Sequence, residues 1–178
     1  MTDLRYDPSE IEPRWQRVWA DERTWEVPNP EPGQAAGDWD ERTKSYVLVM
    51  LPYPSGEPHI GHLKVYSVGD AVAHFHRRAG RRVLQPMGYD AFGLPAENHA
   101  IKTGKHPRDS TLAAIGEFQR QFREWGISVD WSREFATCEP EYYRWTQWIF
   151  LELFKHGLAY RKDAIVKWCP HDQTVLAN

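Results

Sequence analysis

The chain has 178 residues, of which 41% are hydrophobic, so its length and composition suit one globular domain with a buried core. Its formal net charge of -3 argues against a protein that coats nucleic acid through bulk positive charge. No apolar run is long enough to span a bilayer and the start of the chain lacks a signal-peptide pattern, so we expect a cytoplasmic protein with no membrane partner. Two cysteines, Cys138 and Cys169, are too few for a disulfide framework.

The first part of the chain is predicted to form one short helix and a loop. Asp7 can act as the N-cap and Pro8 suits the first helical position, and the apolar residues that follow recur on one helical face. Residues 28–40 are rich in proline, glycine and aspartate and lack periodicity, which is typical of a linker. We therefore assign residues 1–43 to an amino-terminal helix and linker.

A strand, a helix and a second strand are predicted next. The apolar run "KSYVLVML" (44–51) has the length and composition of a strand that is covered on both faces. A helical pattern runs from Ile60 to Gly80, which can supply the left-handed residue at a helix end, and "RRVLQPM" is the second candidate strand. Such a βαβ unit, about 40 residues long, predicts a parallel sheet and an α/β fold.

Two more helices are expected further along the chain. One covers residues 110–126 and ends at a glycine, and the other covers 139–157, begins near a proline and also ends at a glycine. Residues 158–170 are predicted to form one or two strands that enter a turn. An open doubly wound sheet needs a second βαβ half, and ligands bind in the cleft between the halves. We therefore expect this chain to be the front part of a larger protein.

The stretch "PYPSGEPHIGH" (52–62) joins the first strand to the helix. Such a turn can bind phosphate, because the first turn of a helix offers unpaired N–H groups and the positive end of the helix dipole. His59 and His62 lie one helical turn apart and can both donate hydrogen bonds to one polyphosphate, while Gly61 lets a base or ribose approach the backbone. The pattern leaves open a purely structural role and, less favoured, a metal site that includes later histidines.

The same stretch resembles the first signature, HIGH, of the class I aminoacyl-tRNA synthetases. Two longer runs are similar to the leucyl-tRNA synthetases in particular: "VMLPYPSGEPHIGHLKVYSVGDAVAHFHRRAGRRVLQPMGYDAFGLPAENHAIKTG" and "VDWSREFATCEPEYYRWTQWIFLELFKHGLAYRKDAIVKWCPHDQTVLAN". The similarity covers about residues 4–178 in one register, which is far more specific than a four-letter motif. It implies an α/β fold in which residues 44–168 form the first half of a class I synthetase Rossmann-like parallel sheet with flanking helices. Residues 169–178 would be the truncated start of an inserted module.

The resemblance implies a leucine–tRNA ligase, which uses ATP and Mg²⁺ to activate leucine as leucyl-adenylate and then transfers it to tRNA(Leu). His59 and His62 would be the catalytic residues and, together with Gly61, would bind ATP. The protein has little covalent work to do in this reaction, so positioning and charge stabilisation are expected to dominate.

The resemblance also implies a leucine site. Met50, Leu51 and Tyr53 would line the leucine pocket, and Asp90 would bind the α-ammonium group. Asp90 has support from the pattern as well, because it follows the second strand and so lies at the same edge of the sheet as the histidines. The residues alone also allow structural roles, with Met50 and Leu51 in the core, Tyr53 packed on the prolines and Asp90 in a turn.

Two features depart from the family pattern. Many members carry a zinc-binding insertion that begins near "WCP", whereas here Cys169 is followed by His171 and Asp172 and further ligands would lie beyond Asn178, so we assign no metal. The KMSKS loop that completes the ATP site is not found in this sequence, so the chain alone is expected not to aminoacylate. Two alternatives stay open, a truncated non-catalytic module that binds leucine or nucleotide and a nucleotidyltransferase of the HxGH type.

Overall fold

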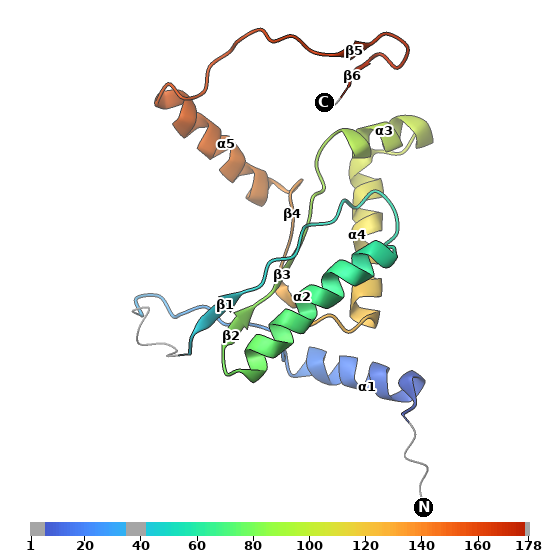
Figure 1. The fold of residues 1–178 in the computed structure, drawn as a ribbon, viewed down its shortest axis with the longest axis vertical. Helices are drawn as coiled ribbons and strands as arrows, with labels where there is room; N and C mark the ends of the chain where they lie inside the picture. Colours follow the sequence, from blue (N-terminus) through green and yellow to red (C-terminus); the bar gives the residue numbers. More distant parts are fainter. Residues whose placement is uncertain (1–5, 35–41, 177–178) are drawn as a thin grey trace, which may run out of the picture. The chain divides into compact units, whose positions relative to one another are not determined.

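Figure 1 shows a computed structural model of the chain, which describes residues 6–34 and 42–176. The chain forms two compact units, one up to Glu139 and one from Pro140 onward. The first unit contains α1 (Pro8–Asp21), β1 (Lys44–Tyr46), α2 (Ile60–Arg78), β2 (Arg82–Leu84), β3 (Pro86–Tyr89), α3 (Leu94–Thr103), α4 (Pro107–Glu124) and β4 (Asp130–Ala136), and the second contains α5 (Pro140–Lys155), β5 (Trp168–Cys169) and β6 (Thr174–Val175). Within the two described ranges, no helix combines the length and the apolar sequence that a bilayer crossing requires.

The first unit is built on parallel strand pairs. β1 pairs with β2 in the register Lys44↔Arg82, and α2 connects the two strands. β3 pairs with β4 in the register Pro86↔Asp130, again in parallel. Gln85 alone separates β2 from β3, and its carbonyl oxygen accepts a hydrogen bond from the N–H of Asp130 at 2.9 Å. The predicted α/β class, with parallel strands and flanking helices, is confirmed.

The strand expected over residues 44–51 is regular only over the three residues of β1. Beyond β1 the chain still runs beside the second strand. Val47 donates its N–H to the carbonyl oxygen of Leu84, and Asp90 donates its N–H to that of Pro52, both at 2.9 Å. The regular ladder ends at Tyr46 because its partner strand, β2, ends at Leu84, the residue opposite Tyr46.

Two helices of the first unit, α2 and α4, end where the sequence predicts. α2 is followed by Gly80 with φ +78°, and α4 by Gly126 with φ +69°, the left-handed conformation that glycine adopts without strain. α3 was not predicted. It has proline in its first turn and ends at Gly104 with φ +68°, but its ten residues, LPAENHAIKT, include few apolar side chains and show no clear periodic apolar face.

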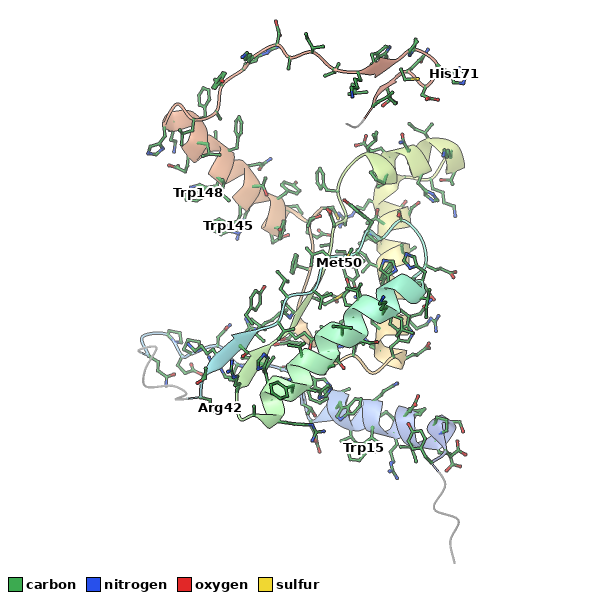
Figure 2. The ribbon with its side chains drawn as sticks, in the orientation of Figure 1. Trp15, Arg42, Met50, Trp145, Trp148 and His171 are labelled. Atoms are coloured by element: carbon green, nitrogen blue, oxygen red, sulfur yellow. The ribbon has the colours of Figure 1, made fainter. Side chains whose placement is uncertain are left out.

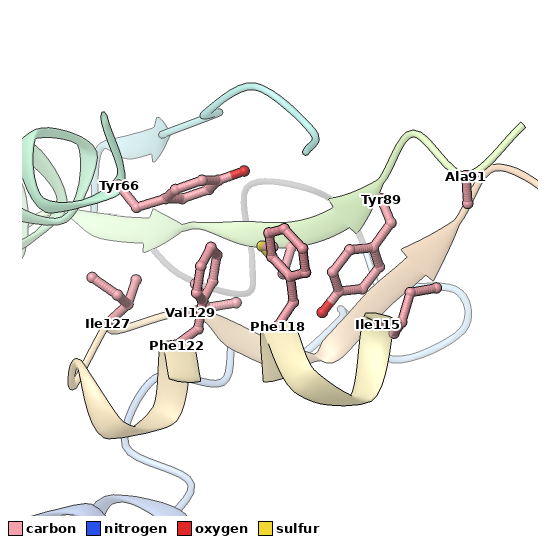
Figure 3. Close-up of a cluster of buried hydrophobic side chains, with 9 residues drawn as sticks. Tyr66, Tyr89, Ala91, Ile115, Phe118, Phe122, Ile127 and Val129 are labelled. Carbon is pink, nitrogen blue, oxygen red and sulfur yellow. The ribbon is translucent and has the colours of Figure 1, made fainter. Parts of the chain in front are cut away.

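The core lies between the strands and the helices α2 and α4, and Figure 3 shows its side chains gathered beside one another. Residues 115, 118 and 122 of α4 are all buried, at the spacing of one helical face. Gly69 brings α2 close to the strand segment, because a Cβ atom at this position would lie 2.3 Å from Cγ2 of Val49. The cluster consists of Tyr66, Met87, Tyr89, Ala91, Ile115, Phe118, Phe122, Ile127 and Val129.

The second unit begins with α5, as predicted, and Gly157 follows it with φ +71°. Figure 2 labels Trp145 and Trp148, two of the exposed apolar side chains of this helix. The strands expected over residues 158–170 are reduced to the two-residue β5, which pairs antiparallel with β6. In the turn between them the Cys169 thiol donates to Oδ2 of Asp172 at 3.2 Å. The predicted division of the chain after residue 168 stays a prediction.

Candidate active site

The start of α2 and the end of β3 lie at the same edge of the parallel strands. α2 is the connection between two parallel strands, so its first turn follows the carboxyl end of one and its last turn precedes the amino end of the other. Asp90 directly follows β3, and its N–H is bonded to Pro52 in the turn that leads to α2. This edge is where ligands bind in open α/β sheets.

His59 and His62 cap the start of α2 reciprocally. His59 is the N-cap residue, and its Nδ1 accepts a hydrogen bond from the N–H of Gly61 at 3.1 Å. The backbone N–H of His59 in turn donates to Nδ1 of His62 at 3.2 Å. The two rings stack with their centroids 3.9 Å apart and their planes at 28°. The predicted placement of both imidazoles at the first turn is therefore what the structure shows, and we call them the histidine pair.

This cap selects one tautomer of the histidine pair. Each Nδ1 accepts a hydrogen bond from a backbone N–H, so each neutral ring carries its proton on Nε2. Protonation of Nδ1 would set two N–H groups against each other and break the cap. Burial, and secondarily the neighbouring His59, lowers the pKa of His62, which also favours the neutral ring. The pair therefore offers two Nε2–H donors beside the positive end of a helix dipole.

Gly61 has a local structural role in this arrangement. A Cβ atom at this position would lie 2.9 Å from Cε1 and 3.0 Å from Nδ1 of His59, closer than ordinary van der Waals contact. The missing side chain therefore lets the His59 ring fold back over the first turn. The sequence predicted Gly61 as a point of ligand approach, and the structure adds this second reason for a glycine.

Two residues that the sequence did not identify as site residues lie against it. Phe118 is buried, and its ring meets His62 edge-on at a centroid distance of 5.3 Å. Tyr66 follows His62 by one helical turn, and its hydroxyl donates to the carbonyl oxygen of Met50 at 2.5 Å. The spacing of four residues between His62 and Tyr66 is the only sequence signal that could have linked Tyr66 to the site.

The structure brings Tyr53 and Asp90 together in one small pocket. Tyr53 is exposed to 57%, whereas the prolines on either side of it, Pro52 and Pro54, are buried. The pocket is lined by Tyr53, Pro54, Ser55, Asp90, Ala91, Phe92, Pro95, Ala96 and Thr111.

Met50, Leu51 and the histidine pair lie outside this lining. Met50, labelled in Figure 2, is exposed to 59%, and Leu51 is half-buried. Met50 is therefore not the core residue that a purely structural role would require. The structure thus groups Tyr53 with Asp90 and His59 with His62, and it places Met50 and Leu51 on the segment that leads to both groups.

The parallel strand pairs, the connecting helix with its capped start and the pocket at the edge of the strands form a Rossmann-like fragment of the class I synthetase type. The model of the family described as "tRNA synthetases class I (M)" matches residues 45–178, and the chain belongs to this family. Within it, the chain is similar to leucyl-tRNA synthetases. It is 53% identical over 173 residues to the leucine–tRNA ligase of Thermotoga maritima, a match that covers 97% of this chain and 20% of that protein.

Further relatives agree with this assignment. The chain is 50% identical over 173 residues to the leucine–tRNA ligase subunit alpha of Aquifex aeolicus, covering 97% of this chain and 26% of the subunit. A solved structure, the ternary complex of Agrobacterium radiobacter K84 agnB2 LeuRS with tRNA and LeuAMS, superposes with a TM-score of 0.83 at 42% identity, covering 97% of this chain and 21% of that one. The resemblance read from the sequence is confirmed, and the chain spans about a fifth to a quarter of the length of these relatives.

Proposed function

We propose that the chain forms the leucine-binding part and a portion of the ATP-binding part of a leucine–tRNA ligase. In the complete protein this site would activate leucine with ATP and pass it to tRNA(Leu). The observation that carries the proposal is the reciprocal cap of the histidine pair, in which both Nδ1 atoms accept backbone N–H groups and both Nε2 atoms stay available as donors at a helix start. The proposed partners, ATP and tRNA, favour the cytoplasm as the compartment.

The proposed chemistry is the attack of a leucine carboxylate oxygen on the α-phosphorus of ATP. A carboxyl oxygen–phosphorus bond forms, the bond between the α-phosphorus and the bridging oxygen breaks, and pyrophosphate leaves with the electron pair. Negative charge grows on the phosphate oxygens during this step. Donors that are already oriented, such as the Nε2–H groups of His59 and His62, stabilise that charge without reorganisation. Holding both substrates in line supplies much of the remaining rate gain.

The amino acid would bind next to the histidine pair. The Asp90 carboxylate is proposed to pair with the α-ammonium group, and Tyr53, from the same pocket, would contact the leucine together with Met50 and Leu51. Support for this grouping comes from the hydrogen bond that ties the backbone of Asp90 to Pro52. It holds the proposed ammonium site next to the residues that are proposed to line the leucine pocket.

Mg²⁺ would enter the site on the nucleotide. Among the residues that the structure describes, no three His, Cys, Asp or Glu side chains are grouped so that they could hold a metal ion. Mg²⁺ commonly binds through substrate phosphates and water with few protein ligands. We therefore expect the ATP phosphates to provide most of its coordination here, and the ion to share the phosphate charge with the histidine pair.

The test is binding of a leucyl-adenylate analogue, leucyl sulfamoyl adenosine, to the purified chain by calorimetry. We expect binding, and we expect it to weaken strongly in His62→Ala and Asp90→Ala but not in Asp21→Ala, which removes an exposed carboxylate from α1. In parallel, the chain would replace the matched 173 residues of the Thermotoga maritima relative, and leucine-dependent pyrophosphate exchange would be measured. A folded chain that binds no analogue, together with a folded chimera that shows no exchange, would refute the proposal.

A further inference from the structure

The Tyr66 hydroxyl connects the helix that carries the histidine pair to the segment that precedes it in the chain. Tyr66 is only 2% exposed, and its hydroxyl donates to the carbonyl oxygen of Met50 at 2.5 Å. Burial raises the pKa of this hydroxyl well above its usual range, so it stays protonated and acts as a donor at any physiological pH. Ionisation of the hydroxyl therefore does not break this bond at physiological pH.

The ring of Tyr66 also packs against α4. His62 and Tyr66 are four residues apart on α2, and Phe118 and Phe122 are four residues apart on α4, so each pair lies on one helical face. His62 meets Phe118 at a centroid distance of 5.3 Å, and Tyr66 meets Phe122 at 4.6 Å. These two aromatic contacts set the rotation of α2 about its own axis. The contacts with α4 therefore hold the His62 and Tyr66 side chains in fixed positions relative to each other.

The start of the segment 50–53 depends on the bond from Tyr66, because the buried side chain of the segment, Pro52, lies beyond Met50 and Leu51. Met50 and Tyr53 are exposed to 59% and 57%, and Leu51 is only half-buried. The regular ladder of β1 has ended before this segment, so its backbone is held by isolated hydrogen bonds. The bond from Tyr66 is made at the first residue of the segment. Without the Tyr66 hydroxyl, the Met50 carbonyl would lose this hydrogen bond and the start of the segment would be held less firmly.

We propose that Tyr66 is a positioning residue that sets the segment 50–53 in register with the histidine pair. This inference rests on the proposed function, in which the segment binds leucine and the pair binds the phosphates of ATP. Tyr66 touches neither substrate. It keeps the distance between the two half-sites constant, so its loss acts on ligands that span both half-sites more than on ATP alone.

The experiment compares two conservative variants of the purified chain. Tyr66→Phe keeps the ring in the core and removes the hydroxyl that reaches Met50. Tyr89→Phe is the matched control: Tyr89 is 1% exposed in the same cluster, and its hydroxyl donates to Oε1 of Glu134 at 2.6 Å and not to the segment. Each variant therefore removes one buried hydroxyl from the same hydrophobic cluster.

Two readouts are taken from each variant. The first needs no ligand: the carbonyl ¹³C shift of Met50 and the amide exchange rate of Leu51 are expected to change in Tyr66→Phe and to stay unchanged in Tyr89→Phe. The second is affinity. Tyr66→Phe is expected to bind leucyl sulfamoyl adenosine about tenfold more weakly, the size of one lost hydrogen bond, with its affinity for ATP changed by less than about twofold.

The inference is overturned if the Met50 carbonyl signal is the same in Tyr66→Phe as in the unmodified chain. It is also overturned if both variants weaken the analogue equally, because that result describes a general loss of core packing. If the unmodified chain binds no analogue, the proposed function fails separately. In that case the Met50 carbonyl signal still decides whether Tyr66 holds the segment.

Discussion

Gly61→Ala should separate the stability of the chain from its ability to bind phosphate. The added Cβ atom would lie 2.9 Å from Cε1 of His59, so the ring has to move by several tenths of an ångström. The cap bond from the N–H of Gly61 to Nδ1 of His59 is already 3.1 Å long, and this movement breaks it. Because the His59 ring stacks on His62, its movement also changes the stacking within the histidine pair.

The two effects on stability nearly cancel. Loss of an N-cap hydrogen bond costs about 1 kcal/mol, and replacement of glycine by alanine in a helix contributes up to about 1 kcal/mol in the other direction. The free energy of unfolding should therefore change by less than about 1 kcal/mol. ATP binding has no such compensation. A hydrogen bond to a charged phosphate is worth about 1.5–3 kcal/mol, so its loss should weaken ATP binding by about tenfold to a hundredfold.

Urea unfolding and calorimetric ATP titration measure the two quantities, with Gly116→Ala as the matched control. Gly116 lies inside α4, and a Cβ atom there would meet nothing within 4 Å. Gly116→Ala should therefore show the full gain of the helix propensity, up to about 1 kcal/mol, with ATP affinity unchanged. The difference between the two variants isolates the cap. If Gly61→Ala stabilises the chain as much as Gly116→Ala and binds ATP equally well, the role assigned to the His59 ring is wrong.

Three other substitutions test the packing of α2 and the titration of His62 by urea unfolding. Gly69→Ala would place its Cβ atom 2.3 Å from Cγ2 of Val49, and this overpacking should lower the stability by about 1–3 kcal/mol; a stabilised variant would contradict the close approach of α2. Ser128→Ala removes a buried hydroxyl that accepts a hydrogen bond from the Arg77 guanidinium and donates one to the Asp70 carboxylate, and it should cost about 1–3 kcal/mol, whereas no loss would mean that the two bonds contribute nothing. Because the folded pKa of His62 is lowered, the unfolded chain binds the proton more readily, so this contribution to stability is complete above about pH 6.5 and is lost as the pH falls toward the folded pKa. His62→Gln should make that decline shallower, and an unchanged slope would show that another group causes it.

The features that the sequence predicted well are marked by local signals. Gly80 and Gly126 adopt positive φ directly after α2 and α4, which is the conformation that ended the predicted helices. The strand over residues 44–51 was predicted too long because its partner strand, β2, ends at Leu84 opposite Tyr46, and apolar composition carries no information about where a partner strand ends. α3 was missed because it has only ten residues and few of them are apolar, too few to form a recognisable periodic pattern.

The candidate site, too, could be predicted only in part from the sequence. The spacing of His59 and His62 was sufficient to place both rings at the first turn of a helix. It was not sufficient to predict the reciprocal cap, because an imidazole is an uncommon N-cap group compared with serine, threonine, aspartate or asparagine. The contact of His62 with Phe118 joins two helices that are distant in the sequence, and only the packed fold shows it.

The prolines of the turn before α2 have a consequence for the kinetics and entropy of binding. Pro52 and Pro54 are buried while Tyr53 between them is exposed, so the backbone is immobilised and the side chain is presented to solvent. A proline also fixes its own φ in the folded turn, which leaves little conformational freedom to be lost when a ligand arrives. Association should therefore proceed without a slow ordering step of this turn. Replacing either proline by alanine should weaken binding through an unfavourable entropy change, with little change in enthalpy.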